Sequence, residues 1–269
     1  RKEMAYNSSP RGTVDFLRYA LQHDRESPAY WSTNGKFQPF LVDVRDFRTN
    51  EAIKSLVQET WDRRLVGEGR DARGLEHNQI VVLGVERIEN ATLFAAYRKA
   101  RRDMLRRQIA RGCICPDIAT LSRRERQNVL TTRLLPGFMK EDLYHEINEH
   151  YVFHGTTVDR IGGLVTGGFN VRQSSDDNLF GRGIYTAEKA IKADQYADPT
   201  QNRSPPGNRL KLILCRMLLG NPLVLQEQFK NPLPAQYDSI ISEGWMFREF
   251  VVKEDDRIYP EYVITYTRQ

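Results

Sequence analysis

The sequence predicts a fold in which short apolar strands are mixed with amphipathic helices. The run Ile80–Ile88 is rich in β-branched residues and is predicted to form a long strand, and Lys211–Leu219 has the composition of a buried one. Between them, Thr92–Arg111 is predicted to form a strongly basic helix. A chain of 269 residues with 40% hydrophobic content can bury one sizeable core, although its length alone permits two domains.

The N-terminal region is predicted to begin with a short helix. Val14, Leu17 and Leu21 have helical spacing, and Thr13 is a candidate cap for a helix that runs to about residue 23. Further elements follow in order: a strand around Leu41, a helix from an N-cap at Asn50 to Leu65, and a glycine-rich charged loop over Gly67–Asn78.

The stretch Glu149–Tyr196 organises the rest of the chain. Its β-forming residues before His154 and Gly155 predict a strand that exposes a ring and a bare backbone at its end. A second short strand is predicted over Ile184–Thr186, followed by a helix over Glu188–Tyr196. Tyr185 and Tyr196 then lie on consecutive elements and can face each other across a flat slot.

Two carboxylates at the C-terminus are candidates to serve this slot. Glu249 opens the β-rich run that ends at Val252, and Glu261 opens the second run, which ends at Tyr266. A carboxylate at the start of an apolar strand is either a solvated strand end or an acceptor aimed into a site. The spacing alone does not choose between the two.

Several separated motifs resemble the catalytic domain of the poly(ADP-ribose) polymerase family. They are YVFHGT, FGRGIYTA, ADQY and YPEYVITY, and they occur in the family's order. The resemblance places His154, Tyr185 and Glu261 in the His-Tyr-Glu arrangement of the diphtheria-toxin-like ADP-ribosyltransferases. Glu261 is preferred because the family's glutamate directly precedes the aromatic residue that opens the last such strand.

The resemblance implies an α+β fold: two packed antiparallel sheets flanked by helices, with an NAD cleft between the sheets. It covers roughly residues 28–269, so residues 1–27 are expected to be a short helical leader to one catalytic domain. The implied substrate is NAD, and the implied acceptors are protein side chains or ADP-ribose chains. The leader is too short to be the helical regulatory domain of the DNA-dependent branch.

The resemblance also assigns binding roles around the slot. His154 should hold the adenosine-side ribose, and Gly155 should offer backbone groups to the nicotinamide carboxamide. Tyr185 and Tyr196 should line the nicotinamide slot, and Arg172 should lie near the adenosine half. The remaining cofactor-binding positions by resemblance are Thr156, Ala187 and Ala193.

This sequence departs from the family pattern in three places. Ala193 stands where much of the family has a serine that holds the carboxamide, and Thr186 stands where phenylalanine is usual. The segment 106–144 is longer than the expected connection and basic, with Ser122–Leu130 predicted to be helical. Its arginines are typical of a solvated face, with nucleic-acid contact as the alternative. The rival to a transferase is a non-catalytic member of the same fold that binds NAD, ADP-ribose or RNA.

Composition limits the remaining function classes. Three cysteines are too few for a disulfide scaffold, which favours an intracellular setting, nuclear or cytoplasmic. Cys113 and Cys115 lack the usual C-x-x-C spacing of a zinc site, so no metal is expected. No apolar run approaches the length of a membrane span. The net charge of +5 suits a phosphate-bearing partner but does not distinguish NAD from nucleic acid.

Overall fold

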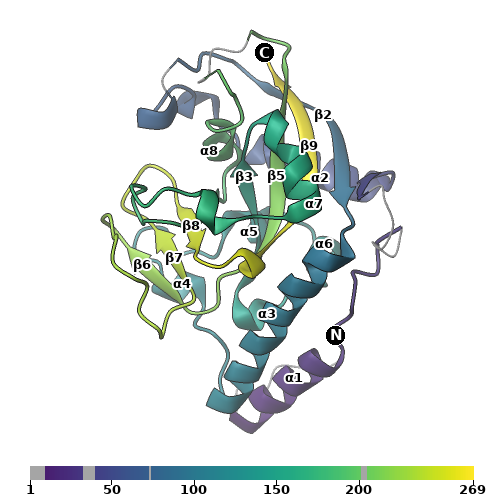
Figure 1. Ribbon diagram of the computed structural model, residues 1–269, viewed down its shortest axis with the longest axis vertical. Coiled ribbons are helices and arrows are strands. Elements are labelled where there is room, and N and C mark those ends of the chain that lie inside the picture. The colour runs from purple at the N-terminus through teal and green to yellow at the C-terminus, as the bar shows by residue number, and fades with distance from the viewer. Residues whose placement is uncertain (1–9, 33–39, 73, 201–204) are drawn as a thin grey trace.

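The computed structural model describes residues 10–32, 40–72, 74–200 and 205–269 (Figure 1). Its strands belong to one mostly antiparallel nine-stranded sheet with the order β1-β2-β9-β5-β3-β4-β8-β7-β6. The strands are β1 (Leu41–Asp43), β2 (Ile80–Ile88), β3 (Glu149–Gly155), β4 (Ile184–Ala187), β5 (Arg209–Leu218), β6 (Pro222–Leu225), β7 (Ser239–Ser242), β8 (Glu249–Val252) and β9 (Ile258–Arg268). The α+β class predicted from the sequence is confirmed.

The expectation of two separate sheets needs a correction. β3 and β4 pair at a single position, Phe153 with Ala187, and this pair joins two sets of strands into one sheet. On one side of it, β3 pairs with β5 along its full length, and on the other, β4 pairs with β8. The two halves are therefore continuous by hydrogen bonding but meet at one narrow junction. β6 and β7 form the parallel pair at the far edge.

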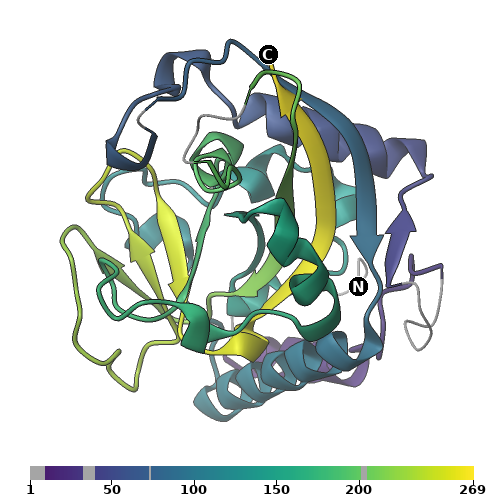
Figure 2. The ribbon, with the colours of Figure 1, turned by 45° about the horizontal axis from the view of Figure 1, so that its top comes forward.

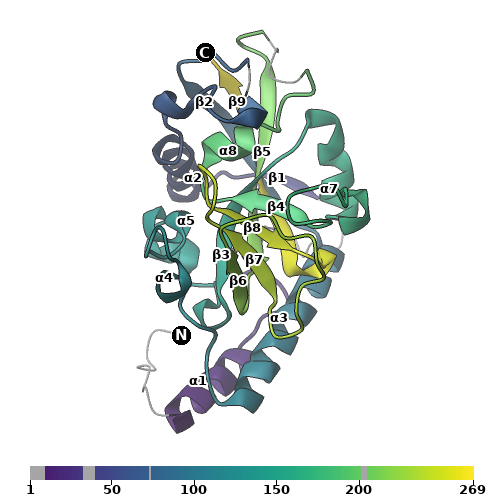
Figure 3. The same cartoon turned by 90° about the vertical axis from the view of Figure 1, so that its left-hand side faces the viewer.

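Helices cover both faces of the sheet. Figure 3 shows α2 and α5 on one side and α7 on the other, and Figure 2 shows α3 lying across the base. The helices are α1 (Pro10–Gln22), α2 (Phe47–Glu59), α3 (Ala91–Arg111), α4 (Ile118–Leu121), α5 (Leu130–Leu134), α6 (Gly137–Lys140), α7 (Ile161–Gly167) and α8 (Ala190–Asp194), with short 3-10 turns η1 (Arg63–Leu65), η2 (Arg70–Ala72), η3 (His145–Ile147), η4 (Val158–Arg160), η5 (Val171–Gln173) and η6 (Asp255–Arg257).

Alternation along β3 divides the hydrophobic core between these two helical layers. Val152 belongs to a buried cluster with residues of α1, α3 and α7, whereas its neighbours Tyr151 and Phe153 belong to a cluster with residues of α2 and α8. Successive side chains of a strand point to opposite faces, so this central strand contributes to both layers. The end of β3 that carries His154, where the slot was predicted, is therefore held by packing on both faces of the sheet.

Several local predictions were wrong at element boundaries. α2 begins at Phe47 because the Asp46 carboxylate accepts a hydrogen bond from the Thr49 amide, so Asp46 and not Asn50 is the N-cap. α1 begins at Pro10, three residues before the predicted cap. The sequence predicts a loop over Phe229–Gly244, but β7 lies inside this stretch; its Ser239–Ser242 run is too short to show a period.

The predicted helix over 122–130 does not form. The buried Glu243 carboxylate accepts hydrogen bonds from the backbone amides of Arg123 and Arg124, at 3.0 and 3.2 Å, and from the Ser122 hydroxyl. Arg126 has a φ of 50°, in the left-handed region, which interrupts a right-handed helix. No helix among the described residues is long and apolar enough to cross a membrane.

Candidate active site

Two adjoining cavities lie where β3, β4 and β8 meet α8. The larger has a volume of about 750 Å³ and extends toward α7 and the segment 169–179. The smaller is a narrow slot of about 120 Å³. Five residues line both cavities: His154, Tyr185, Lys192, Tyr196 and Glu249.

His154 lies at the end of β3, as predicted, and its ring has a defined orientation. Its Nδ1 is 2.9 Å from the Tyr185 carbonyl oxygen, and its ring packs edge-on against Phe169 at 4.9 Å between centroids. Burial lowers the pKa of His154, so the neutral ring is favoured. A carbonyl can only accept, so Nδ1 carries the proton and Nε2 is left as a hydrogen-bond acceptor.

Gly155 is required by close packing at the bottom of the slot. A Cβ placed on it would lie 1.8 Å from the Ala193 carbonyl oxygen. Only glycine lets α8 approach β3 this closely. The approach brings Ala193, which is 3% exposed, to the wall of the narrow slot beside Ala187.

The Tyr185 hydroxyl is held by two hydrogen bonds. Its hydroxyl donates to the Gly181 carbonyl at 2.8 Å and accepts from the Phe180 amide at 3.0 Å. Burial raises the pKa of this hydroxyl to about 12, so the ring is a neutral, fixed wall. Tyr196 forms another wall of the slot and is 45% exposed, as a ring open to a ligand would be.

Glu249 is brought to the slot by strand register. β8 pairs with β4 so that Glu249 is opposite Ala187 and Val251 is opposite Tyr185. Tyr185 and Ala187 point to the same face, and paired residues share a face, so the Glu249 carboxylate lies on the Tyr185 side. Burial raises the pKa of Glu249, while the Lys192 ammonium 3.6 Å from its Oε1 opposes that rise.

The structure does not bring Glu261 to this site, which corrects the choice made from the sequence. Glu261 lies on β9, separated from β8 in the sheet by β5, β3 and β4. Its side chain is fully buried and accepts hydrogen bonds from Arg216 and from the Tyr30 hydroxyl. The second carboxylate, Glu249, takes the place expected for it.

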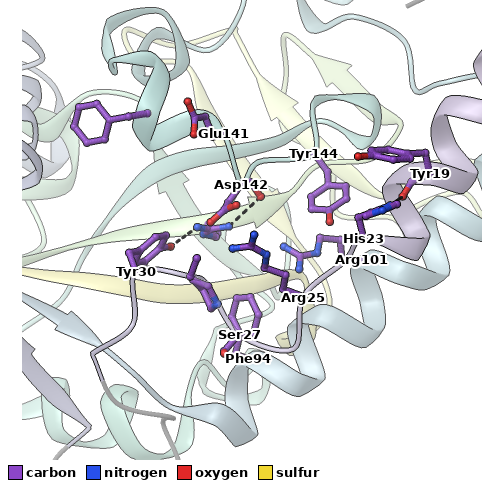
Figure 4. Close-up of a pocket in the computed structure, with 14 residues that line it drawn as sticks. Tyr19, His23, Arg25, Ser27, Tyr30, Phe94, Arg101, Glu141, Asp142 and Tyr144 are labelled. Carbon is purple, nitrogen blue, oxygen red and sulfur yellow. Dashed lines mark hydrogen bonds between the residues drawn. The ribbon is translucent and has the colours of Figure 1, made fainter. Parts of the chain in front are cut away.

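Glu261 belongs to a buried ionic network. Arg216 also lies 3.7 Å from Glu149, and Glu149 in turn lies 3.3 Å from Arg101. Burial disfavours the Glu149 carboxylate, yet the two guanidinium groups outweigh it and lower the pKa of Glu149. Figure 4 shows the edge of this network, where Tyr30 and Arg101 border a separate cavity of about 580 Å³ that shares no lining residue with the slot.

The other sequence-predicted positions divide in two. Thr156, Ala187 and Ala193 each line one of the two cavities. Arg172 lies on η5, is exposed and lines neither of them; its neighbour Gln173 lines the larger one. Sequence reasoning did not single out Lys192, although its position four residues before Tyr196 puts both on one helical face.

The basic segment 106–144 is largely tied to the rest of the fold. Arg107 pairs with Asp238 at 2.6 Å, and Arg124 donates to the Trp245 carbonyl.

The described residues include no group of three His, Cys, Asp or Glu side chains that could hold a metal ion. Cys113, Cys115 and Cys215 are all free thiols.

Comparison with known proteins identifies the family of this domain. The poly(ADP-ribose) polymerase catalytic domain matches residues 68–261. A probable poly [ADP-ribose] polymerase of Dictyostelium discoideum is 32% identical over 124 residues, which is 45% of this chain and 34% of that protein. Protein mono-ADP-ribosyltransferase PARP11 of Homo sapiens is 25% identical over 143 residues, 45% of this chain and 42% of the relative.

A further relative, protein mono-ADP-ribosyltransferase PARP14 of Homo sapiens, is 28% identical over 130 residues, 45% of this chain and 7% of its own length. The chain therefore spans less than half the length of each of these relatives. The catalytic-domain match covers most of the chain, including the strands that carry His154, Tyr185 and Glu249. This chain belongs to the poly(ADP-ribose) polymerase family.

Proposed function

We propose that the protein is an NAD-dependent ADP-ribosyltransferase, which breaks the bond between nicotinamide and ribose and passes ADP-ribose to a protein acceptor. The observation that carries the proposal is that one narrow slot is lined by His154, Tyr185, Tyr196 and Glu249. A flat apolar slot with a carboxylate at its wall suits a nicotinamide ring whose bond to ribose is to be broken. The free thiols and the absence of a disulfide among the described residues support an intracellular setting, nuclear or cytoplasmic.

In this proposal the tyrosines hold the nicotinamide ring. The fixed Tyr185 ring and the exposed Tyr196 ring supply apolar faces, with Tyr196 the stacking partner. The backbone of Gly155, which must be glycine for α8 to approach, is bare enough to contact the carboxamide. Ala193 lines the slot without a hydroxyl, so it contributes no hydrogen bond there.

His154 and Glu249 would act on the two ribose units. The free Nε2 of neutral His154 accepts a hydrogen bond from a hydroxyl of the adenosine-side ribose. Cleavage of the glycosidic bond builds positive charge on the nicotinamide-side ribose, as in other oxocarbenium-like transition states. The Glu249 carboxylate stabilises that charge and holds the ribose 2′-hydroxyl, which is the role first expected of Glu261.

Growth of an ADP-ribose chain is a second proposed activity. A carboxylate in the slot can also accept the proton of an attacking ribose hydroxyl, and Glu249 supplies that carboxylate. Family members that carry this glutamate include chain-forming enzymes. The relatives' names include both a poly- and mono-ADP-ribosyl activity, so names alone do not decide the product.

Labelled NAD provides the direct test. We expect wild-type protein to release nicotinamide and to transfer labelled ADP-ribose to protein, and we expect Glu249→Gln to reduce both by about 10²–10³-fold. Binding of NAD without release of nicotinamide by the wild type would refute the transferase and favour a non-catalytic binding module. Titration with single-stranded RNA in the same buffer tests the nucleic-acid alternative.

A further inference from the structure

Asp71 reaches the larger cavity from outside the sheet. It lies on η2, in the glycine-rich loop between α2 and β2, and it lines the larger cavity. Its Oδ2 accepts a hydrogen bond from the Tyr196 hydroxyl at 2.8 Å and lies 3.2 Å from the Lys192 Nζ. A carboxylate that is 32% exposed thus contacts both ends of the helical turn that forms the wall of the slot.

Lys192 is shared between two carboxylates. Its side chain is only 9% exposed, and its Nζ lies 3.2 Å from Asp71, 3.6 Å from Glu249 and 2.9 Å from the Tyr196 hydroxyl. The same ammonium lies 4.9 Å from the centre of the Tyr196 ring. The Lys192 Nζ lies nearer to Asp71 than to Glu249, so its electrostatic attraction to Asp71 is the stronger of the two.

Among the described residues, few charged groups other than Lys192 and Asp71 surround Glu249. From β4, the Tyr185 hydroxyl is neutral, and from β3, the His154 ring is favoured in its neutral form. α8 contributes Lys192, and η2 contributes Asp71; Ser242 is the partner of Glu249 on β7. The ion pairs of Lys192 therefore dominate the charge balance at Glu249.

We propose that Asp71 is a positioning residue for the reaction. It fixes the Tyr196 ring and restrains Lys192, so that the Lys192 ammonium pairs with both Asp71 and Glu249 and not with Glu249 alone. This rests on the proposed transferase function. The consequence for NAD is a stacking wall held in place by a hydrogen bond to a loop. The consequence for Glu249 is a weaker electrostatic hold on its ionised form.

The sign of the effect on protonation follows from the contacts. Burial raises the pKa of Glu249, Lys192 lowers it and Asp71 raises it. Removing the charge of Asp71 should therefore lower the pKa of Glu249. If the ionised carboxylate is the active form, the acidic limb of the turnover profile should move to lower pH. Replacing Lys192 by methionine should move it the opposite way.

The central variant is Asp71→Asn, which keeps the side-chain shape and one hydrogen-bond acceptor. We expect the midpoint of the acidic limb of the kcat profile to move to lower pH by about 0.5–1 unit. We expect KM for NAD to rise about two- to five-fold. The matched control is Glu68→Gln, which removes one carboxylate from the same loop. Glu68 is exposed, and among the described residues its side chain makes no hydrogen bond or ion pair. Its profile should match the wild type.

Lys192→Met tests the other partner. We expect the midpoint of the acidic limb to move to higher pH by about 1 unit, since an opposite charge within about 4–6 Å lowers a carboxyl pKa by about 1–3 units. In the Asp71→Asn/Lys192→Met double variant, the asparagine change should lower the pKa of Glu249 by less than it does when Lys192 is present, because only the direct repulsion between Asp71 and Glu249 is then removed. Independent, additive shifts would show that Asp71 does not act through Lys192 and would overturn the proposal.

A readout without turnover separates this inference from the proposed function. Nuclear magnetic resonance of protein labelled with ¹³C at glutamate carboxyls reports the Glu249 titration directly, with Glu249→Gln identifying the signal. A lower Glu249 pKa in Asp71→Asn supports the inference even if the wild type transfers no ADP-ribose. An unchanged Glu249 pKa and an unchanged KM in Asp71→Asn would overturn it even if the transferase is active.

Discussion

Glutamine at Glu249 and at Glu261 should impair the protein in two different ways. Glu249 is partly buried beside the slot, where burial raises its pKa and so already penalises the ionised form. The penalty is relieved in a neutral side chain, so we expect Glu249→Gln to change the free energy of unfolding by less than about 1 kcal/mol. Turnover should fall by about 10²–10³-fold, while the Kd for NAD stays within a few-fold.

Glu261→Gln should do the reverse. Arg216 is 1% exposed at its side chain and would lose its main counter-charge. Breaking a buried ion pair costs about 3–5 kcal/mol, and we expect the lower end because Glu149 stays 3.7 Å from Arg216. At about 2–4 °C per kcal/mol for a chain of this size, the Tm should fall by roughly 6–12 °C. The turnover of the folded fraction should stay within a few-fold of the wild type.

The assay combines calorimetric melting, NAD binding by titration calorimetry and nicotinamide release, all on the same preparations below the lower Tm. The result that would refute the assignment is the opposite pattern. A Glu261→Gln protein that melts like the wild type yet releases no nicotinamide would return the catalytic role to Glu261.

Two substitutions and one product analysis of the wild type test the slot further. Ala193→Ser should restore a hydroxyl beside the carboxamide and tighten a benzamide-type inhibitor about two- to ten-fold by calorimetry; equal affinities would mean that residue 193 does not contact the inhibitor. Gly155→Ala should abolish inhibitor binding, because its Cβ would overlap the Ala193 carbonyl at 1.8 Å, and full binding would contradict the close approach of α8. Wild-type protein should add more than one ADP-ribose per site on gels and by mass spectrometry, and single units at saturating NAD would rule out chain growth.

Local pattern was enough to predict the strands that position the slot. The run before His154 and the run around Tyr185 form β3 and β4, and the predicted bounds of β2, Ile80–Ile88, match the structure. These segments carry β-forming residues bounded by turns, so their type follows from short-range preference. The slot itself required two strand ends and a helix to meet, and the motif order was sufficient to predict that meeting.

The choice of carboxylate was not decidable from local pattern. In the sequence, Glu249 and Glu261 both precede an apolar β-rich run, and only the sheet order shows that β8 pairs with β4 whereas β9 pairs with β5 and β2. Strand order is a long-range property, fixed by packing of the whole sheet. The contact of Asp71 was not predicted for a related reason. No local pattern in a glycine-rich loop indicates which distant helix the loop contacts.

The single pair between β3 and β4 gives the sheet a hinge. Phe153 and Ala187 form the one rung that links the half containing β5 and β9 to the half containing β8 and β7. On one face, the smaller half is packed by a cluster of three fully or nearly buried residues, Phe180, Ile240 and Val251. On the other face, Ile184, Ile241, Phe250 and Val252 pack into the main cluster, so opening of the smaller half would expose part of that cluster as well.

The slot straddles this hinge, with His154 on one half and Tyr185 and Glu249 on the other. The hydrogen bond between the His154 Nδ1 and the Tyr185 carbonyl also joins the two halves. A ligand that touches both halves would add a second contact between them, and opening of the smaller half would then also break ligand contacts. Amide protection in β4, β7 and β8 then becomes a measure of occupancy, whereas β2 and β9 report only the global stability of the fold.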